Sequence, residues 1–341
     1  MRNQFRGCLI GTALGDAVGF MVEKQMPETC ANYITDWYLT GKLSQRTRTH
    51  GSGESRITYS FGSYSDDTQL SRELMFSMTE HKGWNPEDYA QRIAVMFKDN
   101  KIVGAGKSTR EAADRLNAGV VWSDAGAVAP AAGNGTAMRA APIGLFYRND
   151  HKTLIRVAKE QSIITHSDPR CQSGSVLIAL AAALCVLPET EWINDSGVFL
   201  DTLMLIAGEN DALDPDTYQG LLVLDDVRTK SFNEAVVAIA GLDKERDVQA
   251  WKWISPYVTT TVMWSLWCFL NHMDNYEAAM TAAVICGGDV DTTASIVGGL
   301  VGTRLGLEAI PTRYLPLIND NGKCRYDDLI RIADDFFDAS L

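Results

Sequence analysis

Residues 7–19 read Gly-Cys-Leu-Ile-Gly-Thr-Ala-Leu-Gly-Asp-Ala-Val-Gly, with glycine at every fourth position from Gly7 to Gly19. In an α-helix, residues four apart lie on the same face, so these glycines would form one strip without side chains. Another backbone can approach such a strip closely, despite the low helix propensity of glycine. The stretch therefore predicts a tightly packed helix in the core of the protein.

The residues around this stretch resemble the start of a secretory signal, because Arg2 and Arg6 precede an apolar run from Cys8 to Val18. Asp16 interrupts that run and no small-residue cleavage site follows it, so we expect no signal peptide. The seven cysteines are widely scattered and contain no CxxC pair. This disfavours a disulfide framework or a zinc ribbon, and we expect a cytoplasmic protein.

Composition limits the classes of protein to which the chain can belong. Its 341 residues are 46% hydrophobic, which is ample for a core, yet no run reaches the roughly 18 to 20 apolar residues of a membrane-spanning helix. Lys and Arg number 31 against 43 acidic residues, so the net charge is −12. That balance opposes general nucleic-acid binding and binding to anionic membranes. An anionic substrate would need local groups to hold it.

Helical periodicity runs through almost the whole chain, and it predicts an all-α fold with one domain over residues 1–341. Strand patterns at 57–59 and 120–122 are too short and isolated to build a sheet. We expect irregular structure at 43–56 and 188–226. The expected helices start after Asn85, cover 109–118, 154–164 and 173–187, and end the chain from Asp327 with Leu329, Ile332, Ala333 and Phe336 buried.

Two acidic clusters stand out, Ser65-Asp66-Asp67-Thr68 and Asp289-Val290-Asp291-Thr292-Thr293, and each immediately precedes an apolar helical pattern. A single Ser or Asp of each cluster could simply cap its helix. Four converging carboxylates, however, would repel one another unless a cation lay between them, and hard divalent ions take such oxygen ligands. Positions i and i+2 of a regular helix point about 200° apart, so we expect Asp289 and Asp291 in the turn before the helix.

Two glycine-rich segments are candidate anion sites. Gly133-Asn134-Gly135-Thr136-Ala137-Met138-Arg139 can expose backbone N–H groups to a phosphate, although it could equally be an ordinary loop into a helix at Ala137. Gly104-Ala105-Gly106-Lys107-Ser108-Thr109 is no Walker A motif, because Lys101 stands where that motif needs glycine. The helix expected near Thr109 could still offer its N-terminus to a phosphate.

Together these motifs resemble the ADP-ribosylglycohydrolases typified by dinitrogenase-reductase-activating glycohydrolase. The resemblance covers nearly the whole chain. It rests on the glycine-rich start, the Ser-Asp-Asp-Thr cluster, Gly-Asn-Gly-Thr-Ala-Met-Arg, the Thr-His-Ser segment at 165–167, and Gly-Gly-Asp-Val-Asp-Thr-Thr at 287–293. It implies an all-α domain with a dinuclear metal cleft and a metal-dependent hydrolysis that releases ADP-ribose from modified side chains.

The resemblance also implies roles for individual residues. It places Glu23, Asp66 and Asp67 in catalysis, with Glu23 as a mobile group beside the metals and Asp16 as a supporting residue. Two Mg²⁺ or Mn²⁺ ions would be held by Ser65, Asp66, Asp67, Asp289, Asp291 and Thr292. The ADP-ribose contacts would come from Gly104, Gly106, Gly133, Asn134, Gly135, Thr136, Met138 and His166.

One departure from the family concerns the position before Gly-Asn-Gly, where some members carry an aromatic residue against the ligand. Ala131 and Ala132 stand there in this chain, so another aromatic would have to stack on the adenine. Without the family pattern, His166 would read as a structural residue at a helix end. Trp251, Trp253, Trp264 and Trp267 read mainly as packing residues.

Three functions follow as expectations. The first is release of ADP-ribose from a modified protein, most naturally from ADP-ribosyl-arginine, reversing the action of an ADP-ribosyltransferase; other ADP-ribose linkages stay open. The second is a dinuclear-metal phosphoesterase, because two metals and anion-binding loops also suit phosphoryl transfer. The third is a protein that binds ADP-ribose without catalysis. We expect ADP-ribosylated protein as the partner, and neither nucleic acid nor membrane.

Overall fold

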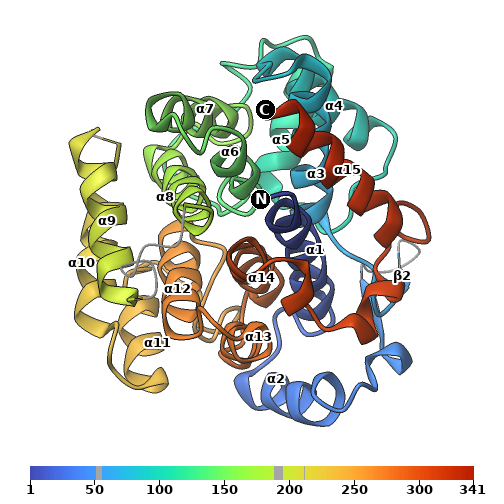
Figure 1. The fold of residues 1–341 in the computed structure, drawn as a ribbon, viewed down its shortest axis with the longest axis vertical. Helices are drawn as coiled ribbons and strands as arrows, with labels where there is room; N and C mark the ends of the chain where they lie inside the picture. The colour runs from blue at the N-terminus through green and yellow to red at the C-terminus, as the bar shows by residue number, and fades with distance from the viewer. Residues whose placement is uncertain (51–55, 188–194, 211) are drawn as a thin grey trace.

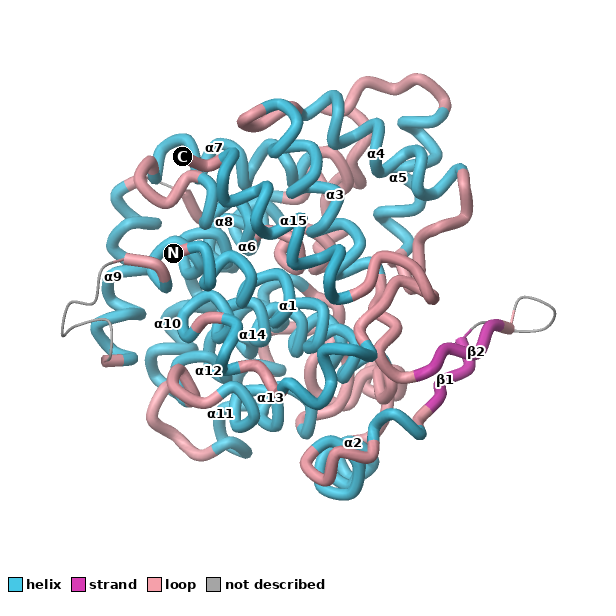
Figure 2. The backbone as a smooth tube through the Cα atoms, turned by 45° about the vertical axis from the view of Figure 1, so that its right-hand side comes forward, coloured by secondary structure: helices cyan, strands magenta, loops and turns pink. Residues whose placement is uncertain are grey.

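A computed structural model describes residues 1–50, 56–187, 195–210 and 212–341. Helices dominate it, as Figure 1 shows, which confirms the expected all-α fold. The sheet in this part of the chain is one antiparallel hairpin, in which β1 (Thr47–His50) pairs with β2 (Ile57–Ser60). The weak pattern at 57–59 is therefore a real strand, and residues 120–122 form none. Figure 2 shows the hairpin projecting from the helical body.

The centre of the fold is the contact between α1 (Arg2–Phe20) and α14 (Val290–Leu305), which lie side by side in Figure 1. A Cβ built on Gly7 would lie 2.0 Å from the carbonyl oxygen of Gly302, and one on Gly15 would lie 2.1 Å from that of Ala294. No side chain fits between these backbones. The predicted glycine strip is thus confirmed as the surface that lets two core helices touch.

Further helices surround this pair, and their bounds agree with the sequence pattern in most places. Asn85 caps the helix that follows it by accepting a hydrogen bond from the Asp88 N–H at 3.0 Å, and the four expected residues of the last helix are buried. These helices are α2 (Pro27–Tyr33), α3 (Asp66–His81), α4 (Pro86–Lys98), α5 (Lys107–Asn117), α6 (Ala141–Phe146), α7 (His151–Ile163), α8 (Pro169–Cys185), α11 (Phe232–Ala240), α12 (Val258–Asn271), α13 (Tyr276–Ile285) and α15 (Tyr326–Ala339).

Three expectations about local structure are wrong. The segment 43–56 contains a 3₁₀ helix (Leu43–Gln45) and β1, while its part at 51–55 lies outside the described residues. The segment 188–226 contains α9 (Ser196–Glu209) and most of α10 (Pro215–Val227), while its part at 188–194 lies outside the described residues. Its polar Asp195 and Asp214 are helix caps that accept backbone hydrogen bonds, so their polarity marks helix starts. The helix expected at Ala137 begins only at Ala141, after a series of turns. Pro142 in its first turn suits a helix start.

All seven cysteines are free thiols, and six of them are buried. The free thiols agree with the cysteine spacing, which disfavoured a disulfide framework. No helix in the described ranges is both long and apolar enough to cross a membrane.

Candidate functional site

The first acidic cluster forms the start of α3. Ser65 is the N-cap but makes no side-chain cap hydrogen bond, and Asp66 and Asp67 occupy the first turn. The capping is done instead by Asp16 of α1, which accepts hydrogen bonds from the Ser65 N–H at 2.9 Å and from the N–H and Oγ1 of Thr68 at 3.0 and 2.6 Å. Asp16 therefore holds the start of α3 in place, while its supporting role at a metal site stays a prediction. Asp66 and Asp67 line a cavity.

The second cluster forms the start of α14. Asp289 is the N-cap, again without a side-chain cap hydrogen bond, whereas Asp291 lies in the first helical turn. The expectation that both precede the helix is therefore correct for Asp289 and wrong for Asp291, because the helix begins at Val290. Their carboxylates still converge, because Asp289 has a non-helical backbone (ψ 66°). One oxygen each of Asp289, Asp291 and Glu23 lie within 4.8 Å of one another.

Burial disfavours the charged form of the carboxylates in both clusters. It raises the pKa of Asp66, Asp67 and Asp291 well above their usual range, and neighbouring carboxylates raise them further. Burial and then the charge of Glu23 raise the pKa of Asp289 to about 6. The two clusters also influence each other. The charge of Asp289 raises the pKa of Asp66, and the charge of Asp67 raises the pKa of Asp291.

The residues present fit a hard divalent cation. Every candidate ligand offers an oxygen from a buried side chain. Oxygens of Asp289 and Asp291 come together with one of Glu23, whereas Asp66 and Asp67 are not part of that group and line the same cavity. Asp67 Oδ1 is buried and has no hydrogen-bond partner among the described residues, although its Oδ2 accepts one from Ser65 Oγ at 3.2 Å. An orphaned carboxylate oxygen is a polar group that a cation would satisfy.

Glu23 follows the end of α1, and Arg48 of the hairpin holds it there. Arg48 Nη2 lies 2.6 Å from Glu23 Oε2, and the same guanidinium also donates to the Phe20 carbonyl. The sequence pattern did not point to Arg48, because it lies in a segment expected to be irregular. Its place at the site follows from the β1–β2 pairing, which short strand signals did not predict.

A cavity of about 330 Å³ joins both clusters to the glycine-rich loops. Ser65 and Thr136 lie behind its wall: the Thr136 hydroxyl donates to the Cys171 carbonyl at 2.9 Å. The other predicted site residues line the cavity, namely Glu23, Asp66, Asp67, Gly104, Gly106, Gly133, Asn134, Gly135, Met138, His166, Asp289, Asp291 and Thr292.

Asn134 ties the Gly-Asn-Gly loop to the second cluster. Its side-chain amide donates to Asp289 Oδ2 and to Thr261 Oγ1, the latter at 3.0 Å. The same residue therefore positions a candidate metal ligand as well as lining the cavity. Gly135 packs closely against His166, since a Cβ on Gly135 would lie 3.1 Å from the imidazole Cε1.

His166 is buried against this loop, and its Nδ1 lies 2.9 Å from Thr165 Oγ1. Burial, helped by the positive charge of Arg139, lowers the pKa of His166 to about 3. The ring is therefore neutral at physiological pH. A neutral imidazole can accept or donate one hydrogen bond to a ligand.

Several cavity residues were missed by sequence reasoning. Lys24 and Lys107 bring positive charge to the rim of an acidic protein, and Trp251 and Pro256 form an apolar edge. Lys24 Nζ lies 5.3 Å from the centroid of the Trp251 ring, within cation–π range. Only proximity in sequence to Glu23 and Gly106 could have indicated the two lysines. Trp251 carried no signal beyond being aromatic.

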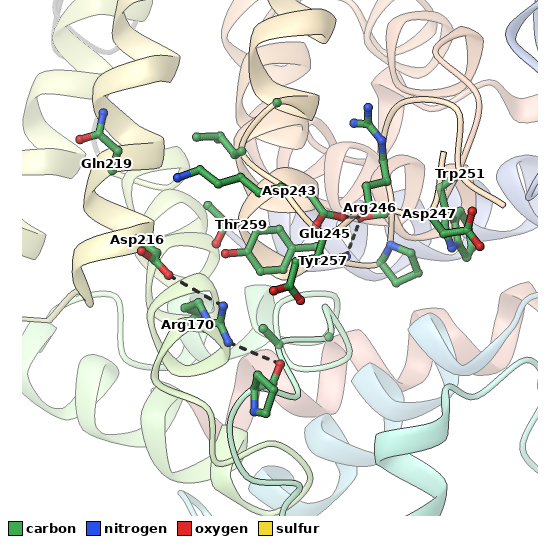
Figure 3. A pocket seen from close by; sticks show the side chains of 18 residues that line it. Arg170, Asp216, Gln219, Asp243, Glu245, Arg246, Asp247, Trp251, Tyr257 and Thr259 are labelled. Atoms are coloured by element: carbon green, nitrogen blue, oxygen red, sulfur yellow. Dashed lines mark hydrogen bonds and ion pairs between the residues drawn. The ribbon is translucent and has the colours of Figure 1, made fainter. Parts of the chain in front are cut away.

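A second pocket, of about 610 Å³, adjoins the first and shares Gly133, Trp251 and Pro256 with it. Figure 3 shows Tyr257 and Arg170 among the residues that line this pocket. Arg170 Cζ lies 5.6 Å from the centroid of the Tyr257 ring. Arg170 also contacts Asp216 at 3.8 Å. The pocket thus combines an aromatic face with hydrogen-bonding groups, which suits a planar polar ligand.

A model of the ADP-ribosylglycohydrolase family matches residues 1–341. The chain is similar to mouse ADP-ribosylhydrolase ARH3 (25% identity, 92% of this chain and 86% of the mouse protein). It is also similar to ADP-ribosylarginine hydrolase Tri1 of Pseudomonas putida (24% identity, 91% and 72%). A solved structure described as an ADP-ribosylglycohydrolase-related protein complex has a similar fold, with a TM-score of 0.68, 24% identity, and 100% and 99% coverage.

Proposed function

The chain belongs to the ADP-ribosylglycohydrolase family, and from that premise we propose that it hydrolyses the glycosidic bond between ADP-ribose and a modified protein side chain. The observation that carries the proposal is the single cavity in which both acidic clusters, the Gly-Asn-Gly loop and His166 meet. Carboxylates gathered beside anion-binding backbone suit a substrate that has a glycosidic bond at one end and phosphates next to it.

We propose that two Mg²⁺ ions, or Mn²⁺ in their place, complete the site. Their ligands would be Ser65, Asp66, Asp67, Asp289, Asp291 and Thr292, whose buried oxygens suit a hard cation. When bound, such ions supply positive charge that orients sugar hydroxyls and lowers the pKa of water.

The reaction itself draws on the chain's carboxylates. Positive charge would develop on the ribose as the bond to the leaving group breaks, and the negative charge of Asp66 and Asp67, which line the cavity, would stabilise it. Glu23 stands beside the second cluster, held by Arg48. We propose that Glu23 takes a proton from the attacking water.

The rest of ADP-ribose would extend away from the clusters. Backbone N–H groups of the glycine-rich loops, the start of α5 and Lys107 suit the diphosphate. The adenosine would enter the adjoining pocket, where Tyr257 supplies an aromatic face beside Ala132. Gly133 forms an isolated β-bridge with Tyr257. The Tyr257 ring, on this neighbouring segment, could therefore stack on the adenine in place of an aromatic side chain at Ala132.

Arginine is the linkage that we propose to test first. A guanidinium leaving group would suit the carboxylate of Glu23 and the Trp251 ring at the rim. A relative named for ADP-ribosylarginine hydrolysis also matches over 91% of this chain.

The test is a panel of ADP-ribosylated peptides with Arg, Ser, Cys and Glu linkages, incubated with the protein and Mg²⁺. Chromatography of the products should show ADP-ribose and the unmodified peptide. Release of AMP would instead indicate a phosphoesterase, and ADP-ribose binding without release from any peptide would indicate a non-catalytic protein. Asp289→Ala and Asp291→Ala should each abolish both release and the thermal stabilisation by Mg²⁺. Full release by both variants would sink the assignment.

A further inference from the structure

Gln69, one turn into α3, is fully buried and binds a neighbouring chain segment in two places. Its Oε1 accepts a hydrogen bond from the Val103 N–H at 2.9 Å, and its Nε2 donates to the Lys101 carbonyl at 2.9 Å. Nε2 also donates to Asp320 Oδ1 at 2.7 Å. The Gln69 amide thus binds one donor and two acceptors. If the amide were flipped, its oxygen would lie against the two acceptor oxygens and its NH₂ group against the Val103 N–H.

The segment that Gln69 holds is joined directly to the candidate site. The Val103 carbonyl accepts a hydrogen bond from the Asp66 N–H at 2.8 Å. The next residue, Gly104, turns with φ +83°, and a Cβ there would lie 3.2 Å from Asp66 Oδ1. From this turn the chain runs through Gly106 into α5 along the cavity wall.

A partly buried ion pair holds the other side of Gln69. Asp320 comes from the segment before α15, and its Oδ2 accepts a hydrogen bond from Arg72 Nη1 at 2.9 Å. Arg72 also donates to the Tyr64 hydroxyl at 3.0 Å. Arg72 and Asp320 thereby fix the direction of the Gln69 amide.

We propose that Gln69 is a positioning residue for the reaction. By holding residues 101–103 against α3, it sets both the backbone of Asp66 and the Gly104 turn against which the diphosphate would lie. Gln69 does not line the cavity, so it would act through the segment and not by touching the substrate. The proposal rests on the proposed function for its substrate, but its structural part concerns the segment alone.

The decisive variant is Gln69→Glu, which keeps the shape of the side chain and removes both hydrogen bonds that Nε2 donates. An oxygen of the introduced carboxylate would then lie against the Lys101 carbonyl and the Asp320 carboxylate, where Nε2 had donated hydrogen bonds. These oxygens repel one another, so the segment should detach from α3. We expect kcat/KM to fall and the Kd of free ADP-ribose to rise, each by about tenfold or more. Hydrogen exchange of the metal-free protein should quicken in peptides covering 99–106 and stay unchanged in α8.

Two further variants separate positioning from a general loss of stability. Leu224→Ala removes a buried side chain of α10, a helix without marked contact to α3. It should lower the melting temperature while leaving kcat/KM within about twofold. Asp320→Asn added to Gln69→Glu restores a donor opposite the introduced carboxylate, and should recover about threefold or more of the lost kcat/KM.

The proposal is overturned if Gln69→Glu keeps wild-type exchange at 99–106, or loses no more kcat/KM than Leu224→Ala at an equal melting temperature. Failure of Asp320→Asn to recover any activity also counts against it. If the wild-type protein releases no ADP-ribose from any peptide, the proposed function is wrong instead. The exchange measurement then still decides whether Gln69 holds the segment.

Discussion

Gly11 and Gly298 are packed backbone to backbone. A Cβ built on Gly11 would lie 2.1 Å from the Gly298 carbonyl oxygen, and one built on Gly298 would lie 2.3 Å from the Gly11 carbonyl oxygen. The contact is reciprocal, so neither helix can shift to accept a methyl group on the other. It also sets the end of α1, where Glu23 follows, beside the start of α14 with Asp289.

Gly11→Ala should therefore destabilise the protein strongly. The added methyl group would collide with a carbonyl oxygen of α14, which is backbone and cannot rotate away. We expect a loss of about 3 kcal/mol or more in the free energy of unfolding, at the upper end for overpacked cores. Urea unfolding followed by circular dichroism measures this loss.

Gly208→Ala is the matched control for that change. Gly208 is exposed in α9, and a Cβ there would meet nothing within 4 Å. Alanine should raise stability by a few tenths to about 1 kcal/mol, because it is the better helix former. Equal effects of the two substitutions would contradict the close α1–α14 contact.

Asp67→Asn should make the metal-free protein more stable and abolish its response to metal. Asp67 is buried among carboxylates, and one of its oxygens lacks a hydrogen-bond partner among the described residues. Removing its charge relieves repulsion, which should add about 1 kcal/mol to the free energy of unfolding in EDTA. Thermal unfolding with EDTA and with Mg²⁺ measures both effects. Asp226→Asn, on the exposed face of α10, should change neither.

Local patterns predicted the parts of the site that stand next to one another in sequence. Sequence spacing alone pointed to the glycine strip, to Asp66 with Asp67, and to Asp289 with Asp291. In a helix, the spacing of residues determines which of them share a face. The cavity brings the two pairs of aspartates together as expected, while the glycine strip lies at the contact between α1 and α14. The roles of these residues as metal ligands stay predictions.

The missed residues reach the site through tertiary contacts. Arg48 arrives with a hairpin, and Trp251 arrives from the segment before α12. Neither has a partner at a fixed sequence distance that a pattern could reveal. Asp195 and Asp214 had the opposite effect, because they made a helical segment look irregular. Helix caps and loops use the same polar residue types.

His166 should make the protein less stable in mild acid. Its pKa is lowered to about 3 in the folded protein by burial and by the charge of Arg139, whereas an unfolded histidine titrates near 6.5. Below pH 6.5 the unfolded chain therefore binds a proton that the folded protein refuses, and stability falls as pH falls. Between pH 7.5 and 5 this group should cost about 2 kcal/mol.

The measurement compares wild type with His166→Asn, which carries no titrating group, by urea unfolding at both pH values. The wild type should lose about 2 kcal/mol more than the variant. His151→Asn, at the start of α7, serves as the control for removing a histidine elsewhere. An imidazole signal of His166 that titrates near 6.5 in the folded protein would contradict its buried, neutral state.

Lys107→Glu should weaken substrate binding without impairing the chemical step. Lys107 is 87% exposed at the start of α5, where it adds positive charge to a helix end on the cavity rim of a chain with net charge −12. An anionic diphosphate would feel this charge in the bound state and in the transition state alike, so KM should rise about fivefold while kcat stays nearly constant. The effect should shrink as salt rises, because exposed charges are screened. Lys152→Glu, exposed on α7 and away from both pockets, makes the same change in net charge and should leave KM unaltered. An equal rise in KM for the two variants would assign the effect to overall charge and not to the rim of this cavity.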